Sequence, residues 1–461
     1  MWSLFPNPCR LPSRIDRALL IRRALSLLAL ALCIVLHLLT GDGLLTKLHV
    51  ALRRATTPPC TPGHLLLPDA AIPRPRALTV CNMLGEDNFR SVHEWLAFHL
   101  AQGVQRFDMV YDLISPFNAT TYSRFLEVLE PRVREGIVFT HRKEDARPWL
   151  RRLGAQAKAA RAADPRACGP AEADTDALLA QLAECEREGA TWCYQRIFHA
   201  LCVGEARLRG DRWLGLFDGD EYFFQPGRPG MEGPCFYGGR PPGEEPGAPA
   251  AVDVDSRRGA DELGASECAL PLSEAPLLVG RGLAAALDSH WSGWGSISVR
   301  GVAFGLNDDG AYRRKGLVME AHTRTARYDY WGFQVGPPGR EYLACPEAIC
   351  GKMAPHKSFI AVEHAPAGGT QVHVHQVGAV KTYFPGKGAP LRLNHYHADD
   401  MEALEWKSQW SSTYTNLIEN KEGIKDYMRS WPDNSGRAFS ALLHFCMNSS
   451  NWRHAACWAP G

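Results

Sequence analysis

Residues 213–224, Trp-Leu-Gly-Leu-Phe-Asp-Gly-Asp-Glu-Tyr-Phe-Phe, are the stretch of this chain that decides its fold class. The first five residues form an apolar run of the length expected for a buried strand, and residues 222–224 begin a second apolar run. Three carboxylates stand between the two runs. Acids beside buried strands are costly unless a cation neutralises them, and α/β sheets bind ligands at strand ends. The stretch therefore predicts a ligand site in an α/β fold.

The spacing of these acids suits a hard divalent cation. In an extended chain Asp218 and Asp220 point the same way, and Gly219 lets a ligand approach the backbone. Such a site usually keeps several waters and completes its shell with substrate phosphates, which predicts a metal–diphosphate site. Two other interpretations stay open at this point, a surface turn with solvated acids and a calcium site in a structural loop.

The N-terminus predicts a membrane anchor. Five arginines within residues 10–23 precede an uncharged run over residues 24–40, which is at the short end of the roughly 17–25 residues of a membrane-spanning helix. Because positive charge favours the cytosolic side, residues 1–23 are expected in the cytosol and the rest of the chain in a lumen. A cleaved signal peptide is the competing interpretation. A short span suits the thinner internal membranes.

Composition agrees with a lumenal globular body. The chain has 461 residues, 45% of them hydrophobic, which is enough for a sizeable core in one large or two modest domains. A formal net charge of +1 without a basic stripe indicates no nucleic-acid partner. Fourteen cysteines favour an oxidising compartment, with Cys185/Cys193 and Cys345/Cys350 as short disulfide loops.

The order of elements predicts a parallel sheet. Residues 41–76 are rich in proline and are interpreted as an extended stem. A strand from residue 77, a helix over 88–100 and a strand over 107–112 form a βαβ unit. Two stretches look like insertions: one, over 145–190, predicts a solvated helix, and the other, about 226–285, begins with a Gly- and Pro-rich loop.

The order of motifs over residues 77–410 resembles the family 92 glycosyltransferases, within the wider family-2-like group of GT-A folds. The matching segments are Glu94-Trp95-Leu96 with His99 and Gly103, Tyr111-Asp112 with Ser115, Asp218-Gly219-Asp220-Glu221-Tyr222-Phe223, Phe304-Gly305, Glu320, Lys357-Ser358, His375, and Asn394-His395-Tyr396 with Lys407. A lone Asp-x-Asp is a weak signal, whereas the ordered set is specific. The chain departs from the family pattern at Met83-Leu84-Gly85-Glu86 and at Leu306-Asn307-Asp308-Asp309.

The resemblance implies an α/β fold of the GT-A type, a nucleotide-sugar-binding sandwich with a mostly parallel central sheet, preceded by one N-terminal transmembrane helix. It places a catalytic domain at 77–430 and a C-terminal extension at 431–461. The implied activity is metal-dependent transfer of a sugar, with galactose as the expected sugar, from a UDP-sugar donor to a glycan or polysaccharide acceptor, with inversion. The implied cofactor is Mn²⁺ or Mg²⁺, and the implied location is the Golgi membrane, with the catalytic domain lumenal.

The resemblance also suggests how the donor is held. Asp112 would accept a hydrogen bond from the uridine, although an acid after a strand is as often a turn cap. The metal would be bound by Asp218 and Asp220, and Asp218 would thereby also contact the diphosphate. His395 is the first choice for a third ligand and His375 the second, with a buried structural histidine as the alternative. Lys357 would contact phosphate, unless it is simply solvated.

An inverting reaction needs a general base for the acceptor hydroxyl. The candidates are Asp308, Asp309 and Glu320, although an acid in such a position equally well caps a helix. Glu221 follows the metal pair directly and would take part in catalysis by supporting it. Two other classes of function stay open, an inactive lectin-like glycan-binding module and a structural type II membrane protein.

Overall fold

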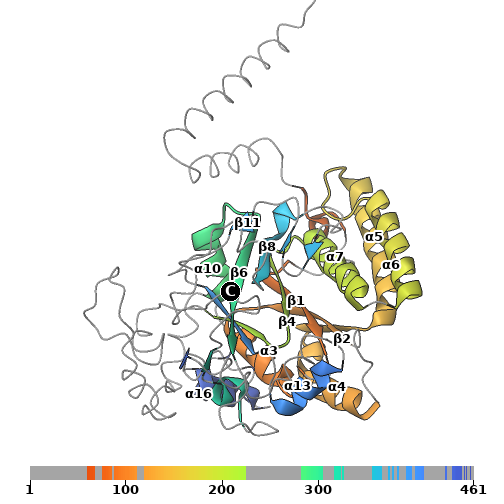
Figure 1. The fold of residues 1–461 in the computed structure, drawn as a ribbon. Helices are drawn as coiled ribbons and strands as arrows, with labels where there is room; N and C mark the ends of the chain where they lie inside the picture. The colour runs from red at the N-terminus through yellow and green to blue at the C-terminus, as the bar shows by residue number, and fades with distance from the viewer. Residues whose placement is uncertain are drawn as a thin grey trace, which may run out of the picture. The chain divides into compact units, whose positions relative to one another are not determined.

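In the computed structural model, the strand predicted ahead of the three acids forms as β4 (Trp213–Asp218). It lies in parallel beside β1 (Leu78–Leu84), with Met83 opposite Asp218. On its other side β1 pairs in parallel with β2, and β2 pairs in parallel with β3. The predicted strand–helix–strand order is confirmed, with β2 at Arg106–Tyr111, β3 at Val138–His141, α3 at Val92–Ala101 and α4 at Ala119–Arg134 (Figure 1).

These elements belong to a unit that begins at Cys60. The structure describes residues 60–67, 75–85, 88–111, 119–189, 191–224, 282–304, 316–322, 324–325, 356–365, 372–373, 376–377, 382–383, 391–396, 400–409, 431–432, 439–448, 451, 453 and 457. The predicted span 24–40, most of the insertion at 226–285 and the Cys345/Cys350 loop lie outside them. Among the described helices, none is long and apolar enough to cross a membrane.

The order of the strands reverses at β1. Along the chain, β2 and β3 are added on one side of β1, whereas β4 joins it on the other side. In open α/β sheets, ligands bind outside the carboxyl ends of the strands at such a switch point. Leu84 ends β1 and Asp218 ends β4. The three acids therefore stand at the edge of the sheet where a ligand site is expected.

The other half of the sheet is mixed. β8 (His356–Ala361) runs antiparallel to both of its neighbours, β4 and β6 (Ser296–Phe304). β12 (Arg392–Tyr396) pairs in parallel with β6 and antiparallel with β5 (Glu221–Phe224), which places His395 opposite Glu221. The central strands β3, β2, β1 and β4 are the parallel part of this α/β fold. The short strands are β7 (Arg324–Thr325), β11 (Thr382–Tyr383), β13 (Trp431–Pro432) and a separate pair, β9 (Val372–His373) and β10 (Gln376–Val377).

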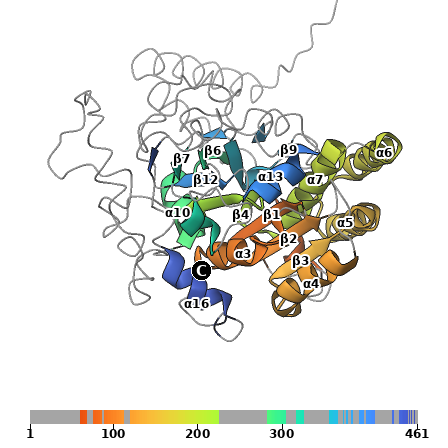
Figure 2. The ribbon, with the colours of Figure 1, turned by 60° about the horizontal axis from the view of Figure 1, so that its bottom comes forward.

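Helices cover both faces of the sheet and bury two apolar clusters. Along β4, Trp213 and Phe217 belong to one cluster and Leu214 and Leu216 to the other, as the alternation of a strand requires. The first cluster includes α3, α10 and α16, and the second includes α5, α6 and α7 (Figure 2). Their bounds are α5 at Ala146–Ala163, α6 at Glu172–Glu188, α7 at Thr191–Arg209, α10 at Gly282–Trp291 and α16 at Ser440–Met447.

The prediction of a solvated helix over residues 145–190 is wrong. The segment forms two helices, α5 and α6, which pack against each other and against α7 (Figure 1). The buried stripe of α5 consists of Trp149, Leu150, Leu153, Ala157 and Ala160. Its second half is alanine, which is small enough to let helices approach closely. An alanine stripe does not stand out by hydrophobicity, and for this reason the pattern escapes a search for apolar periodicity.

Four disulfides join the described segments. The predicted Cys185–Cys193 loop is confirmed. A second bond, Cys81–Cys202, joins β1 to α7 inside the core. The other two are Cys60–Cys168 and Cys446–Cys457.

The interpretation of residues 41–76 as an extended stem is wrong for residues 60–67, which pack on the globular body. Besides the disulfide from Cys60 to Cys168, the Thr61 N–H donates to the Arg166 carbonyl over 3.0 Å, and the Thr61 carbonyl accepts from the Cys168 N–H over 2.8 Å. The Thr61 hydroxyl donates to Asp164 over 2.5 Å. The globular unit therefore includes the segment from Cys60.

We expect Cys60→Ser to lower the free energy of unfolding by about 2 kcal/mol. A crosslink between residues 108 apart restricts the unfolded chain, although its measured value is often below the chain-entropy estimate. Urea denaturation under oxidising conditions measures the difference. The wild-type chain in reductant is not a valid reference, because all four disulfides would open. Equal stability of Cys60→Ser and wild type would show that the hydrogen bonds of Thr61 alone hold this segment.

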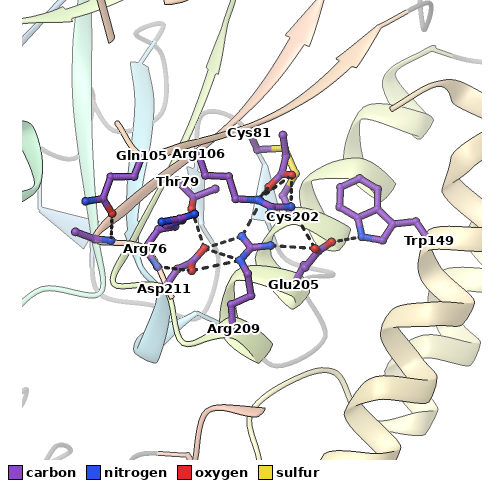
Figure 3. Close-up of polar contacts among 12 residues, drawn as sticks. Arg76, Thr79, Cys81, Gln105, Arg106, Trp149, Cys202, Glu205, Arg209 and Asp211 are labelled. Carbon is purple, nitrogen blue, oxygen red and sulfur yellow. Dashed lines mark hydrogen bonds and ion pairs between the residues drawn. A yellow bond between two sulfur atoms is a disulfide. The ribbon is translucent and has the colours of Figure 1, made fainter. Parts of the chain in front are cut away.

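A network of buried charges lies at the amino ends of the parallel strands, at the edge opposite the three acids. The Asp211 carboxylate accepts from the Arg76 N–H, the Thr79 hydroxyl and the Arg209 guanidinium (Figure 3). Arg209 also contacts Glu205 over 3.0 Å and Asp108 over 3.7 Å. Burial opposes the charge of Arg209, but Asp211, Glu205 and Asp108 outweigh it and raise its pKa. The network joins α7 to the first strands of the sheet.

Candidate functional site

The three acids lie in a tight turn between β4 and β5. Asp218 is the last residue of β4 and Glu221 the first of β5, and residues 219–220 form the turn. The sequence predicts that Gly219 leaves room for a ligand, and the structure gives it another role. A Cβ at this position would lie 2.6 Å from Leu84 Cδ2 and 3.0 Å from Asn88 Cγ. Gly219 is needed because the segment after β1 packs directly on the turn.

Helix α3 packs against the turn and hydrogen-bonds to the backbone of β5. The indole N–H of Trp95 donates to the Glu221 carbonyl over 2.8 Å. One turn later, His99 Nδ1 lies 2.9 Å from the Trp95 carbonyl, and the Phe223 N–H points to His99 Nε2 at 3.5 Å. The Glu94 carboxylate accepts the N–H groups that begin α11 (Val318–Ala321). These family-matching residues position the backbone of β5 and α11.

We expect acidification to destabilise the fold through His99. Burial lowers the pKa of His99 to about 3, because its ring lies among Trp95, Phe98 and Phe217. Below about pH 6.5 the unfolded chain binds a proton at His99, whereas the buried ring in the folded chain stays neutral. The contribution of neutral His99 to the stability of the fold is thus fully present above about pH 6.5 and is lost as the pH falls toward about 3. Between pH 7 and pH 5 we expect a loss of about 2 kcal/mol from this residue.

Urea denaturation of wild type and His99→Gln at both pH values measures this contribution. Glutamine keeps a hydrogen-bond acceptor and does not titrate, so the pH-dependent loss should shrink even though the variant is less stable overall. An equal loss in both proteins would contradict the assignment to His99.

The first acid, Asp218, is bound to a lysine of β8. Its carboxylate contacts the Lys357 ammonium group, and its backbone N–H donates to Glu221 Oε2 over 2.8 Å. Lys357 lies 3.3 Å from Glu221 Oε1 as well and is 4% exposed. Burial opposes the charge of Lys357, but Asp218 and Glu221 raise its pKa above the usual value. The predicted phosphate-binding lysine therefore neutralises two acids of the turn.

The second acid, Asp220, faces two basic residues from other elements. Its Oδ2 lies 2.6 Å from the Lys407 ammonium group, on α13 (Met401–Ser408). Its Oδ1 lies 3.6 Å from His395 Nε2, on β12. Burial opposes the charge of Asp220, but Lys407 and His395 outweigh it and hold its pKa well below the usual value. Asp220 is therefore an ionised carboxylate at neutral pH.

The third acid, Glu221, is the most deeply buried. Its side chain is 1% exposed, and its Oε1 lies 3.7 Å from His395 Nδ1. Burial raises the pKa of Glu221 to about 7, against the lowering effect of Lys357. Among the described residues, three carboxylates face two ammonium groups in this cluster.

Asp220, Glu221 and His395 together form a group that fits a divalent cation. One ligand atom from each of the three lies within 4.8 Å of the others. Among the described residues, neither Asp220 Oδ1 nor Glu221 Oε1 has a hydrogen-bond partner, although Glu221 Oε1 lies 3.3 Å from Lys357; both atoms are buried and lie beside His395. Carboxylate oxygens suit Mg²⁺ and Mn²⁺, whereas an imidazole is the more usual ligand of zinc and iron. Of the predicted ligands, Asp220 and His395 belong to this group, whose third member is Glu221 rather than Asp218.

Lys407, on helix α13, is a residue of this site to which sequence reasoning assigned no role. Asp400 caps the helix by accepting the Ala403 N–H, and Arg90 contacts both Asp400 and Glu402. These contacts tie α13 to the segment before α3 and bring Lys407 to the acidic turn. The one available signal was the place of Lys407 after Asn394-His395-Tyr396 in the family-like order of motifs.

The other predicted residues are not brought to this cluster by the described contacts. Glu320 accepts the Leu317 N–H over 3.1 Å and lies 3.0 Å from His444 Nε2 on α16. It thus has the helix-capping role that the sequence left open. The remaining predicted site residues lie outside the described segments: Asp112, Asp308, Asp309 and His375.

No protein-family model matches this sequence, and a search of curated proteins returned no match.

Proposed function

We propose that this chain is a metal-dependent glycosyltransferase that moves a sugar from a UDP-sugar to a glycan or polysaccharide acceptor with inversion. The observation that carries the proposal is the group of Asp220, Glu221 and His395 at the carboxyl edge of the parallel strands. It stands at the switch point of the sheet, where α/β folds bind nucleotides. The family-92-like order of motifs supports the same activity and a GT-A type of fold.

The contacts of the residues support the following roles. Asp220, Glu221 and His395 would hold Mn²⁺ or Mg²⁺, which when bound supplies positive charge that stabilises the leaving nucleoside diphosphate. Lys357 keeps Asp218 and Glu221 in place through its two contacts. The family resemblance suggests Asp112 as a partner of the uridine and galactose as the sugar. Asp308, Asp309 and Glu320 stay as the candidates for the general base.

The proposal includes a Golgi location as a single-pass type II membrane protein. The uncharged run over residues 24–40 after five arginines supports an anchor with a lumenal body. The four disulfides support an oxidising lumen, because such bonds are rare in the cytosol.

The experiment is a screen of nucleotide-sugars with the full-length chain in detergent. Each UDP-sugar is incubated with Mn²⁺, and release of UDP is measured with and without a mixture of glycan acceptors. We expect Mn²⁺-dependent release from one UDP-hexose, faster with acceptor. Glycan binding without any donor turnover would overturn the proposal in favour of a lectin-like module. Absence of both activities would favour a structural membrane protein.

A further inference from the structure

Asp220 lies between two basic side chains, the Lys407 ammonium group and the imidazole of His395. Its Oδ2 is bound by the Lys407 ammonium group over 2.6 Å, whereas its Oδ1 has no hydrogen bond within the described part of the chain and lies 3.6 Å from His395 Nε2. A divalent cation that took Asp220 as a ligand would compete with Lys407 for the charge of the same carboxylate. The contact between Lys407 and Asp220 therefore opposes metal binding.

The two lysines of the cluster differ in burial and in the element that carries them. Lys357 contacts two acids, Asp218 and Glu221, and its side chain is 4% exposed. Lys407 contacts Asp220 from the last turn of α13, and its side chain is 12% exposed. The amino end of α13 is fixed by Asp400 and Arg90, whereas Lys407 reaches the turn through a flexible four-carbon stem. Lys407 can thus change partner without movement of the helix.

We propose that Lys407 is an exchangeable counter-ion, which leaves Asp220 when a divalent cation binds there and pairs with the diphosphate of the nucleotide. This inference rests on the proposed function. A nucleoside diphosphate bound to the cation brings negative oxygens to the neighbourhood of Asp220, and a lysine binds phosphate as a point charge. The exchange couples the two ligands: Lys407 weakens binding of the metal alone and strengthens binding of the nucleotide with the metal.

The coupling gives Lys407→Met effects of opposite sign. Methionine keeps an apolar stem and removes the charge. In the full-length protein, we expect it to tighten binding of Mn²⁺ alone by about tenfold, because the competing cation is gone. In saturating Mn²⁺, we expect it to weaken binding of UDP by about tenfold, because a charged partner of the phosphates is gone. Electron paramagnetic resonance of free Mn²⁺ and calorimetric titration with UDP measure the two affinities.

Two further variants separate this role from a loss of structure. Lys158→Met removes an exposed lysine from α5, paired with Glu172 over 3.2 Å, and should leave both affinities unchanged. Lys407→Arg keeps the charge and should restore both affinities toward wild type. A damaged site would weaken both ligands and would not be repaired by arginine.

The outcomes distinguish this inference from the proposed function. If wild type binds Mn²⁺ and UDP but Lys407→Met changes neither affinity, or weakens both, the exchange is overturned and the proposed function stands. If wild type binds no Mn²⁺ at millimolar concentration, with or without UDP, the metal-dependent function and the exchange are both overturned.

Discussion

We expect Asp220→Asn to lower sugar transfer by at least about 100-fold. Asparagine keeps the size of the side chain and removes the ionised carboxylate that lies between Lys407 and His395. Loss of one principal group that stabilises transition-state charge typically costs a factor of about 10²–10³ in rate. The measurement is kcat/KM for the UDP-sugar at several Mn²⁺ concentrations. If the acid acts through the metal, binding of Mn²⁺ should weaken together with transfer.

The control for this variant is Glu172→Gln, on the exposed start of α6. It removes the same charge at a site far along the chain from the acidic turn and should change transfer by less than about twofold. Glu402 is a poor control, because it contacts Arg90, which also holds the cap of α13. Transfer at the wild-type rate in Asp220→Asn, with an unchanged dependence on Mn²⁺, would contradict the proposed mechanism.

Local pattern was sufficient to predict the frame of the sheet. The apolar runs before and after the acids, and the strand–helix–strand spacing ahead of them, formed as expected in β4, β5, β1, α3 and β2. Each of these signals lies within one element, so no knowledge of distant contacts was needed. Burial by alanine in α5 and the docking of residues 60–67 had no such local signal.

The grouping of the acids shows where local pattern fails. Asp218 and Asp220 point the same way only in an extended chain, and residues 219–220 form a turn. The turn directs Asp218 to Lys357 and places Asp220 and Glu221 beside His395. Lys407 lies 187 residues after Asp220 in the chain, and apart from its place in the family-like order of motifs nothing in the sequence connects it with the acidic turn. Only tertiary packing brings it there.

The family-like motifs near residue 95 show a second limit of reasoning from the sequence alone. Trp95 and His99 hold the backbone of β5, and Glu94 caps α11. A motif match identifies such residues as belonging to a site without showing whether they touch a ligand or support those that do. Their burial and backbone partners give them the supporting role here.

The stability of the sheet depends on charges that lie far from this site. In the network at the amino ends of β1, β2 and β4, Asp211 accepts three kinds of donor: a backbone N–H, a hydroxyl and the guanidinium of Arg209. Both side chains of the Arg209–Asp211 pair are 0% exposed. Breaking a buried pair by removal of one partner is far more costly than the net value of the pair, because the other charge stays buried.

We therefore expect Asp211→Ala to lower the free energy of unfolding by about 3–5 kcal/mol. The variant leaves Arg209 with one acid partner fewer and removes the acceptor for Arg76 and Thr79. Urea denaturation at neutral pH measures the loss. Glu130→Ala breaks an exposed pair with Arg134 on α4, and we expect it to cost less than about 1 kcal/mol. Similar small losses in both variants would show that water or a rearranged network compensates the buried charge.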